Sequence, residues 1–598
     1  MAATTILQRL LLLALIVTST LSAYCDAPSP AFPPPQLDSK THASKLHKTT
    51  NRITRAVEDI INRDEFNTTH LSLEITSQFS GLLSLQHTAR ERSELRPGAT
   101  RITDRSMYRI ASMTKPFTVL ALFQLQKAGK LDLDDPISLY LPELNTTGTG
   151  KGRGGLPFKD ITLRALASQI TGIPRDLAQQ DVVNNPDEAD RLGLPPLPDA
   201  GRFKGDYNLP ECDQNVNYTR ACNSTDLLGW VDQLSPLFAP NQKSTYSNLN
   251  FDLLGLVIAK VSDMTYEEYI EIEILREIGM NNTSFSTPPD DVAAVARGIE
   301  FYWPFEIGVQ NPTGGLYSSS SEMSIWLRYV LSTFNAQATG VNWFNPTSFS
   351  GSLNSYYGMP FEIFRAKTKD VIFDTSNSTR PLTFVTKGGG LPGYTSNVVM
   401  IPEYGLGITI LIAGDGKALS EILQAVTEEM VAFAEQAALD ELWHRYAGVF
   451  NDPASNSTMV IAVSNHDGLH ITHFISNSRD VKAAIDREDE QMVFHLMPTL
   501  LFANEEKQRG ERWRIMPQKR RSSAGGKGKA SVWDNFCVSD VSWIMYAGKP
   551  VNEVVFWGGG VGEGQRVGEV ELTGFRKVLG RQEEEKSGEV ALGLVEQF

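Results

Sequence analysis

Residues 109–129 read RIASMTKPFTVLALFQLQKAG, and this stretch decides how the rest of the chain is interpreted. Val119, Leu122 and Phe123 recur at helical spacing, and Gly129 is a typical C-terminal stop. The pattern predicts a buried helix that begins near Ser112.

The start of this helix carries the only Ser-x-x-Lys of the chain, Ser112 to Lys115. Three residues are close to one helical turn, so both side chains share a face. A serine hydroxyl needs a nearby base to become a nucleophile, and burial or a second cation lowers the pKa of a lysine enough for that task. Backbone N–H groups at a helix start can also stabilise an oxyanion. Taken alone, the motif equally fits a helix N-cap followed by a surface lysine.

A second motif, Tyr246-Ser247-Asn248, is the only Tyr-x-Asn and precedes a helix predicted from Phe251 to Val261. A phenol near two lysines ionises more easily and can shuttle a proton, and Asn248 can bind a substrate carbonyl. The alternative is a turn with a half-buried tyrosine.

The third motif is Lys387-Gly388-Gly389-Gly390. Glycines let a ligand approach the backbone of a strand closely, and Lys387 adds a positive charge for a substrate carboxylate or a proton relay. The alternative is a glycine-rich turn.

The three motifs occur once each, in one order and with roughly even spacing, and together they resemble the serine β-lactamase and penicillin-binding superfamily. Tyr-x-Asn is similar to the class C branch and its esterase and D-aminopeptidase relatives. The segments 161–174, 313–318 and 389–394 resemble further blocks of the family. The resemblance covers about residues 50 to 437. It implies an α+β fold in which an antiparallel sheet is flanked by helices, with a helical lobe beside the cleft.

The resemblance also implies roles for individual residues. Ser112 would attack a carbonyl and become acylated, Lys115 would hold or accept its proton, and Tyr246 would act as general base and later activate water. Substrate binding would fall to four residues, with the N–H groups of Ser112 and Gly390 as the oxyanion hole. These four are Asn248, Lys387, Gly389 and Gly390.

Two positions depart from the family pattern. Gly388 follows Lys387 where the family usually has Thr or Ser, which removes a hydroxyl that often contacts a substrate carboxylate. Gln169 and Ile170 stand in the region of the usual histidine of the Ser-His-Thr-Ser-Gly segment. Both changes bear on β-lactam recognition more than on catalysis.

The N-terminus predicts secretion to the extracellular space. Arg9 precedes the apolar run Leu10 to Val17, and small or polar residues follow, as in a signal peptide over residues 1–25. Cleavage fits after Ser22 or after Cys25, and the alternative is an uncleaved signal anchor. No later stretch is apolar for long enough to span a membrane. Residues 26–45 are a Pro-rich linker.

Sequons and cysteines agree with secretion. Cys212 and Cys222 can close a short loop disulfide, and retention of Cys25 decides whether Cys537 has a partner; no CxxC occurs. Candidate N-glycosylation sites are Asn67, Asn145, Asn217, Asn223, Asn281, Asn282, Asn377 and Asn456.

Composition and charge limit the classes of molecule that this protein is expected to bind. The formal charge of −15 and pI of about 5.2 disfavour nucleic acid, because an acidic surface repels phosphate. We expect a small-molecule or short-peptide substrate and neither cofactor nor metal. His470 and His473 are three residues apart and would point to opposite faces of a strand. The oligomeric state is not predicted.

Two domains are predicted, the catalytic domain over 46–440 and an all-β domain over 441–598. Residues 46–61 and 419–437 have amphipathic helical patterns, 70–88 alternate as strands, and 398–401 with 406–412 read as a hairpin.

The all-β domain resembles the lipocalin-like appendage of some secreted fungal β-lactamase-like proteins, on the segment 446–449 and its strand rhythm. Within it, the basic stretch 507–529 is interpreted as a solvated loop between strands. A protease-processing site is the alternative for that stretch.

These patterns together predict a secreted serine hydrolase that forms an acyl-serine intermediate on an ester, lactone, amide or β-lactam. The absence of a Gly-x-Ser-x-Gly elbow sets aside a Ser-His-Asp hydrolase. The alternative from another class is a catalytically silent binding protein on the same scaffold.

Overall fold

The computed structural model describes residues 33–145, 155–177, 182, 186–195, 212, 220–337, 343–372, 378, 380–486, 492–519, 544–558 and 566–582. The predicted signal peptide and the first residues of the linker lie outside these ranges. The described residues divide into two compact units, one within residues 43–365 and 383–429, the other within residues 33–42, 366–382 and 430–582.

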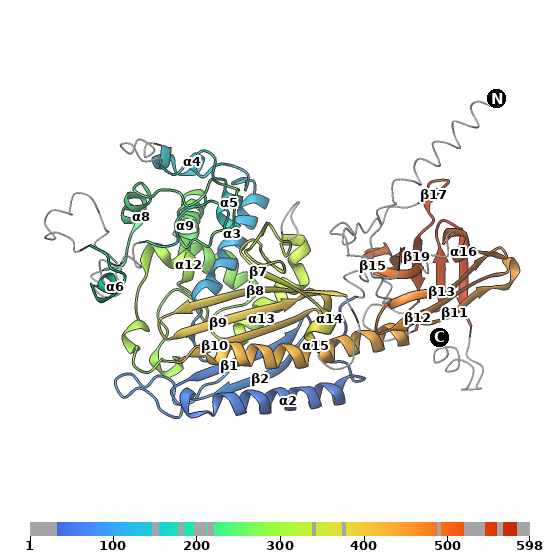
Figure 1. The fold of residues 1–598 in the computed structure, drawn as a ribbon, viewed down its shortest axis with the longest axis horizontal. Helices are drawn as coiled ribbons and strands as arrows, with labels where there is room; N and C mark the ends of the chain where they lie inside the picture. The colour runs from blue at the N-terminus through green and yellow to red at the C-terminus, as the bar shows by residue number, and fades with distance from the viewer. Residues whose placement is uncertain are drawn as a thin grey trace. The chain divides into compact units, whose positions relative to one another are not determined.

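The sheet of the larger unit is largely antiparallel (Figure 1). Its order is β2 (Gly81–His87), β1 (His70–Ser77), β10 (Leu406–Ala413), β9 (Tyr394–Ile401), β8 (Pro381–Leu391), β7 (Glu362–Lys367), β6 (Ser355–Tyr357) and β5 (Ser348–Phe349). Every residue of β1 and β10 is buried, so both strands are covered on both faces. The predicted strands at 70–88 and the predicted hairpin are confirmed, and Gly405 ends the hairpin connection at φ +57°.

Helices cover the sheet. Helix α2 (Ala43–Ile61) and the first part of α15 (Ala418–Arg445) run side by side, joined by ion pairs from Arg52 to Glu429 and from Arg63 to Glu421. Helix α13 (Ser320–Gln337) packs against β1 and β10. The two amphipathic helices predicted from the sequence are thus confirmed, although α15 extends to Arg445.

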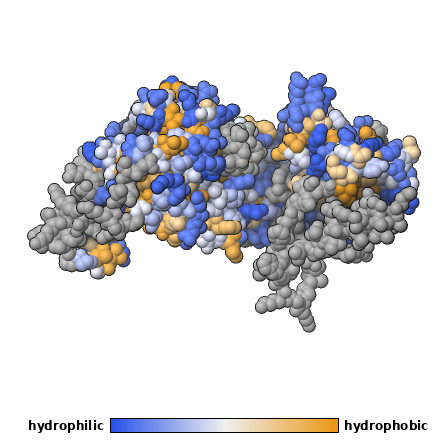
Figure 2. Space-filling model, turned by 90° about the horizontal axis from the view of Figure 1, so that it is seen from above, coloured by the Kyte–Doolittle hydropathy of each residue, from blue (hydrophilic) through white to orange (hydrophobic). Residues whose placement is uncertain are grey.

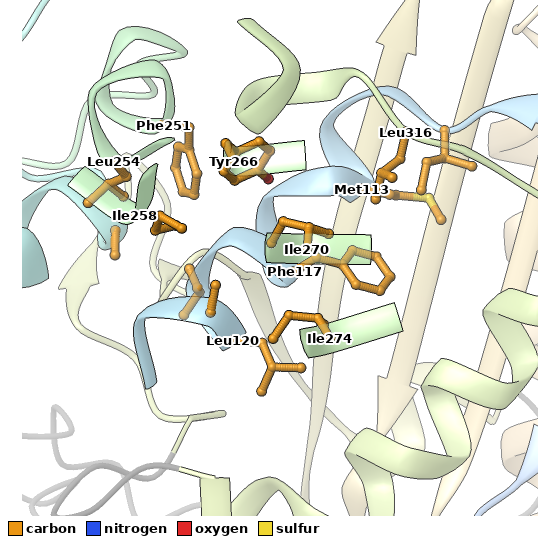
Figure 3. Packing of buried hydrophobic residues seen from close by; sticks show 14 of the residues in the cluster. Met113, Phe117, Leu120, Phe251, Leu254, Ile258, Tyr266, Ile270, Ile274 and Leu316 are labelled. Carbon is orange, nitrogen blue, oxygen red and sulfur yellow. The ribbon is translucent and has the colours of Figure 1, made fainter. Parts of the chain in front are cut away.

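The helical lobe is built around α3 (Lys115–Lys127) and α9 (Leu249–Ser262), which pack together through fully buried apolar side chains (Figure 3). Both predicted helices are confirmed, with one difference. Ser112 lies in a 3-10 turn, η2 (Ala111–Thr114), and the α-helix begins only at Lys115. Pro116 explains the boundary, since proline lacks an N–H and fits the first turn of a helix.

The other unit contains a closed antiparallel barrel. Its strands are β11 (Gly448–Asp452), β12 (Ser457–Ser464), β13 (Gly468–Ser476), β15 (Met492–Asn504), β16 (Arg509–Lys519), β19 (Glu553–Trp557), β20 (Glu569–Leu572) and β21 (Lys577–Arg581). Each pairs with the next, and β21 pairs back with β11. These strands agree with the expected all-β region, apart from the short helix α16 (Val481–Ile485).

The solvated-loop interpretation of residues 507–529 is wrong for residues 509–519, which form strand β16. Trp513 and Ile515 are buried, whereas Arg512 and Arg514 are only partly buried. This alternation with a period of two is the strand pattern, and the basic composition obscured it. Residues 520–529 lie outside the described ranges.

No helix among the described residues is long and apolar enough to cross a membrane. On the face seen in Figure 2, hydrophobic residues form separate patches between hydrophilic ones.

Candidate active site

Ser112 lies where β3 (Tyr108–Arg109) gives way to the lobe. The residue before it, Ala111, adopts φ +51°, a left-handed conformation that is uncommon for a residue with a Cβ. Ser396 of β9 donates to the carbonyl of Ile110 at 2.7 Å, which ties this turn to the sheet. Ser112 is half-buried while its neighbours are buried, so its hydroxyl is the reachable group of the turn.

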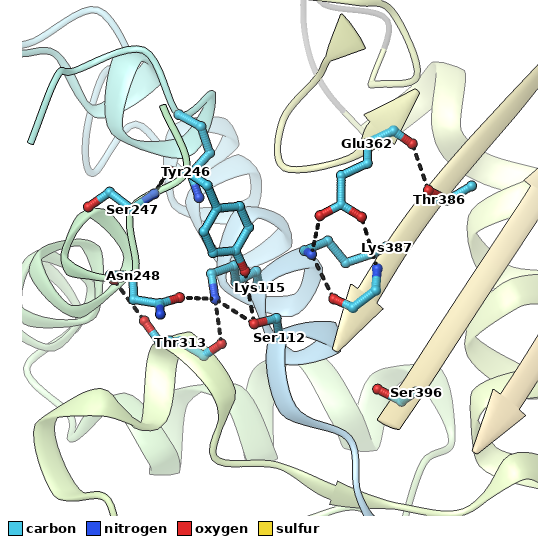
Figure 4. A network of polar contacts seen from close by, with 12 residues as sticks. Ser112, Lys115, Tyr246, Ser247, Asn248, Thr313, Glu362, Thr386, Lys387 and Ser396 are labelled. Atoms are coloured by element: carbon cyan, nitrogen blue, oxygen red, sulfur yellow. Dashed lines mark hydrogen bonds and ion pairs between the residues drawn. The ribbon is translucent and has the colours of Figure 1, made fainter. Parts of the chain in front are cut away.

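Lys115 is 0% exposed, and its Nζ lies within hydrogen-bond distance of three oxygens (Figure 4). These are Ser112 Oγ at 3.0 Å, Asn248 Oδ1 at 2.9 Å and the carbonyl of Thr313 at 2.8 Å. Burial lowers the pKa of Lys115, and the neighbouring Lys387 lowers it further, against the opposing effect of Tyr246. The amine is therefore easier to deprotonate than an ordinary lysine.

The Tyr246 hydroxyl lies 2.9 Å from Ser112 Oγ. Nζ of Lys115 and Nζ of Lys387 each lie 5.1 Å from the centroid of its ring. Burial alone would raise the pKa of Tyr246, but the two lysines outweigh it and lower that pKa to about 8. A phenolate beside the serine is thus accessible near neutral pH.

Asn248 is held at both ends of its amide. Its Oδ1 accepts from Lys115, and its Nδ2 donates to Asp176 Oδ1 at 2.6 Å. Thr313 Oγ1 lies 2.8 Å from the carbonyl oxygen of Asn248 and 2.7 Å from Asp252 Oδ1, and its single hydrogen can be donated to either. Asp176 therefore fixes which way the amide faces, and the sequence contained no pattern that singled it out.

Gln169, one of the two departures from the family pattern, supports the second motif. It is buried and adopts φ +61°. Its Oε1 accepts from the N–H of Ser247 at 2.8 Å and from Asn250 Nδ2 at 2.9 Å. The glutamine thereby supplies an acceptor that holds the loop carrying Tyr246.

The third motif lies on β8, where Lys387 is 1% exposed. Its Nζ donates to Glu362 Oε1 at 2.7 Å and to the carbonyl of Gly388 at 2.7 Å. Burial lowers the pKa of Lys387, but Tyr246 and Glu362 outweigh it and raise that pKa above its usual value. Sequence reasoning missed Glu362, which lies 25 positions away from Lys387.

Gly389 brings the backbone of β8 against the nucleophile turn. A Cβ at this position would lie 2.4 Å from the carbonyl of Ile110 and 3.1 Å from the nitrogen of Ser112, so only glycine fits. Gly390 is exposed, and a Cβ there would meet nothing within 4 Å. The strand thus runs beside the N–H of Ser112, as the predicted oxyanion hole requires.

The remaining predicted positions are the disulfide and the candidate glycosylation sites. The Cys212–Cys222 disulfide is present, with an S–S distance of 2.04 Å. Asn67 is half-buried, and the other candidate glycosylation sites with described side chains are exposed, namely Asn223, Asn281, Asn282 and Asn456. Asn217 and Asn377 lie outside the described residues, as does the side chain of Asn145.

Comparison with known proteins places the chain in a family. The Beta-lactamase family model matches residues 86–428, more than half of the chain, and a model described as "Beta-lactamase-like-like, C-terminal domain" matches residues 438–583. The chain belongs to the β-lactamase family. The predicted resemblance is confirmed, as is the prediction of a hydrolase of this family.

Two fungal relatives match along most of their length. A "Probable hydrolase" of Phoma sp. is 30% identical over 565 residues, covering 92% of this chain and 90% of that protein. Another, of Cochliobolus lunatus, is 29% identical over 554 residues, covering 88% and 87%. A solved D-stereospecific amidohydrolase from Streptomyces sp. aligns with a TM-score of 0.45 at 19% identity, over 63% of this chain and 98% of that chain.

Proposed function

We propose that this protein is a secreted serine hydrolase that cleaves its substrate through an acyl-Ser112 intermediate. The observation that carries the proposal is the position of Ser112 Oγ, 3.0 Å from Lys115 Nζ and 2.9 Å from the Tyr246 hydroxyl. Both neighbours have pKa values lowered toward neutrality, so the nucleophile has two candidate proton acceptors in contact.

In the acylation step, ionised Tyr246 takes the Ser112 proton as Oγ bonds to the substrate carbonyl carbon. The carbonyl π electrons move onto its oxygen, which the N–H groups of Ser112 and Gly390 stabilise. When the tetrahedral intermediate collapses, the leaving group departs and receives the proton from Tyr246. Lys115, buried beside the phenolate, favours its negative charge.

Deacylation repeats these transfers with water. Tyr246 accepts a proton from the water as the water oxygen bonds to the acyl carbon, and the proton passes to Ser112 Oγ as the acyl group leaves. One lone pair of Asn248 Oδ1 and one hydrogen of its Nδ2 are used by Lys115 and Asp176, and its second Nδ2 hydrogen can meet a substrate carbonyl. An ester, lactone, amide or β-lactam of a small molecule or short peptide suits this chemistry.

Secretion and glycosylation are part of the proposal. The disulfide between Cys212 and Cys222 supports it, because such bonds persist in oxidising compartments. Exposed sequons such as Asn223 are positions where a glycan can be attached. Sequencing the N-terminus of the mature protein distinguishes cleavage after Ser22, cleavage after Cys25 and an uncleaved anchor.

We also infer that the C-terminal barrel is lipocalin-like. The up-and-down order in which each strand pairs with the next and the last closes onto the first supports this inference. Packing of Tyr446, Trp513 and Phe556 against one another fills part of it with aromatic rings.

Hydrolysis of a chromogenic ester and a chromogenic cephalosporin by the wild type and by Ser112→Ala tests the proposed function. We expect turnover of at least one compound and a loss of about 10³-fold or more in the variant, as for removal of a nucleophile. A fluorophosphonate label on Ser112 is the second readout. A folded wild type that takes no label and cleaves neither compound would be the binding protein considered above.

A further inference from the structure

We propose that the active site selects substrates that carry no carboxylate next to the scissile bond, because Glu362 occupies the position where the third motif would bind one. This inference rests on the proposed function and names the substrate class within it. The preferred substrates are uncharged on that side, such as neutral esters and lactones.

Glu362 makes the contacts expected of a bound carboxylate. Its Oε1 accepts from Lys387 Nζ at 2.7 Å, and its Oε2 accepts from the N–H of Gly388 at 3.1 Å (Figure 4). An ammonium and a backbone N–H are a strong pair of donors for a carboxylate. The carbonyl of Glu362 accepts from Thr386 Oγ1 at 2.8 Å, which fixes the start of β7 against β8.

Lys387 has little capacity left for a second carboxylate. Its Nζ donates to Glu362 and to the carbonyl of Gly388, so at most one of its three hydrogens remains. The residue is 1% exposed, whereas the side chain of Glu362 is 28% exposed. Glu362 is thus the more exposed member of the ion pair, and its negative charge repels a second carboxylate that comes close to Lys387.

Gly388 supports the same inference. The family usually has a residue with a hydroxyl at this position, and that hydroxyl contacts a substrate carboxylate. A Cβ at Gly388 would lie 3.6 Å from Asn397 Nδ2 and 3.7 Å from Glu362 Oε2, which are ordinary contact distances. Space therefore does not exclude a side chain at this position, and the missing hydroxyl agrees with a site that does not recognise an anion.

Arg175 is the competing cation at this site. Its guanidinium carbon lies 4.9 Å from the centroid of the Tyr246 ring, and its side chain is 56% exposed. Its Nε lies 3.4 Å from Asp176 Oδ2, so this charge also faces a carboxylate within the protein. Lys387 and Arg175 both border the Tyr246 ring, and each contacts a carboxylate of the protein. Glu362 is the residue to test, because it contacts the lysine of the third motif.

The test uses two aryl esters with the same acyl group, one with a meta-carboxylate and one with a meta-carboxamide on the leaving phenol. We expect the wild-type kcat/KM to be at least about tenfold higher for the ester that carries the carboxamide than for the ester that carries the carboxylate. Glu362→Gln should reduce this preference about tenfold or more, chiefly through a lower KM for the anionic ester. The matched control is Glu421→Gln, which makes the same charge change on α15, where Glu421 contacts Arg63.

The outcomes separate the two hypotheses. If the wild type cleaves neither ester and Ser112 takes no fluorophosphonate label, the proposed function fails. If Ser112 is labelled but neither ester is cleaved, the proposed function stands and the inference of a preference for neutral esters is wrong. If it cleaves both with similar kcat/KM, or if Glu362→Gln leaves the preference unchanged, the proposed function stands and the selectivity inference is wrong. Should the anionic ester be accepted and lose its rate selectively in Arg175→Gln, Arg175 is the carboxylate site and the inference is overturned.

Discussion

Replacing Lys387 with methionine should move the pH dependence of hydrolysis to higher pH. In the wild type, burial acts to raise the pKa of Tyr246, but Lys115 and Lys387 outweigh it and bring that pKa to about 8. Nζ of Lys387 lies 5.1 Å from the centroid of the Tyr246 ring. If this distance is taken as the separation of two unit charges, they interact by about 3 kcal/mol at an effective dielectric constant of about 20. This free energy corresponds to roughly a hundredfold change in the ionisation constant of the phenol. Glu362, left without its partner, would act in the same direction.

The consequence for the rate follows from the ionised fraction of Tyr246. With a pKa of about 8, roughly a tenth of the phenol is ionised at pH 7, so kcat/KM there should fall on the order of a hundredfold in the variant. The difference between the two enzymes should shrink as the pH approaches about 10, where the phenol of the variant also begins to ionise.

The assay is kcat/KM for a neutral aryl ester between about pH 6 and about pH 10.5. Lys417→Met is the matched control, because the side chain of Lys417 is 85% exposed. A curve that keeps its midpoint near pH 8 and is only scaled down at every pH would refute the idea that Lys387 sets the ionisation of Tyr246.

Three further predictions concern support of the site and stability. Gln169→Met should lower kcat about tenfold or more, because it leaves the N–H of Ser247 without its acceptor. The lost acceptor should also lower the free energy of unfolding by about 1–3 kcal/mol. Steady-state kinetics and denaturant unfolding measure the two effects, and an unchanged kcat would exclude the positioning role. Burial raises the pKa of Glu74 to about 7. The contribution of neutral Glu74 to the free energy of unfolding is therefore fully present below the ordinary pKa of 4.5 and is lost as the pH rises through 7. Glu74→Gln should therefore stabilise the protein by up to about 3 kcal/mol at pH 8 but not at pH 4, and equal effects at both pH values would contradict this reasoning. Replacing Cys212 and Cys222 by serine should cost about 3 kcal/mol, because the bond closes a short loop in the unfolded chain, and unchanged thermal unfolding would argue against it.

The elements that depend on local patterns could be predicted from the sequence. Apolar residues at helical spacing located α3 and α9, and alternating residues located β1, β2 and the β9–β10 hairpin. The spacing of Ser112 and Lys115 placed their side chains together, and the structure brings them within 3.0 Å. The order of the three motifs resembles that of the family, and this resemblance placed Tyr246 in the same site.

The residues that orient the site could not be predicted, because their contacts join distant parts of the chain. Glu362 meets Lys387 only when β7 pairs beside β8, and Asp176 meets Asn248 across 72 positions. Gln169 stands in the region of the family's usual histidine, but its role as an acceptor depends on a left-handed backbone conformation that the sequence does not indicate. The basic composition of the segment that contains strand β16 (Arg509–Lys519) favours a solvated loop and hides the strand's period of two.

The buried amine of Lys115 has a consequence for how this domain can be improved. A lysine with no exposed surface and a lowered pKa is held in surroundings that disfavour its charged form. A methionine of similar length at this position would remove the energetic cost of the buried amine, but it would also abolish hydrolysis. Selection for heat resistance alone should therefore enrich inactive variants at this position, and a useful screen must score turnover in the same well.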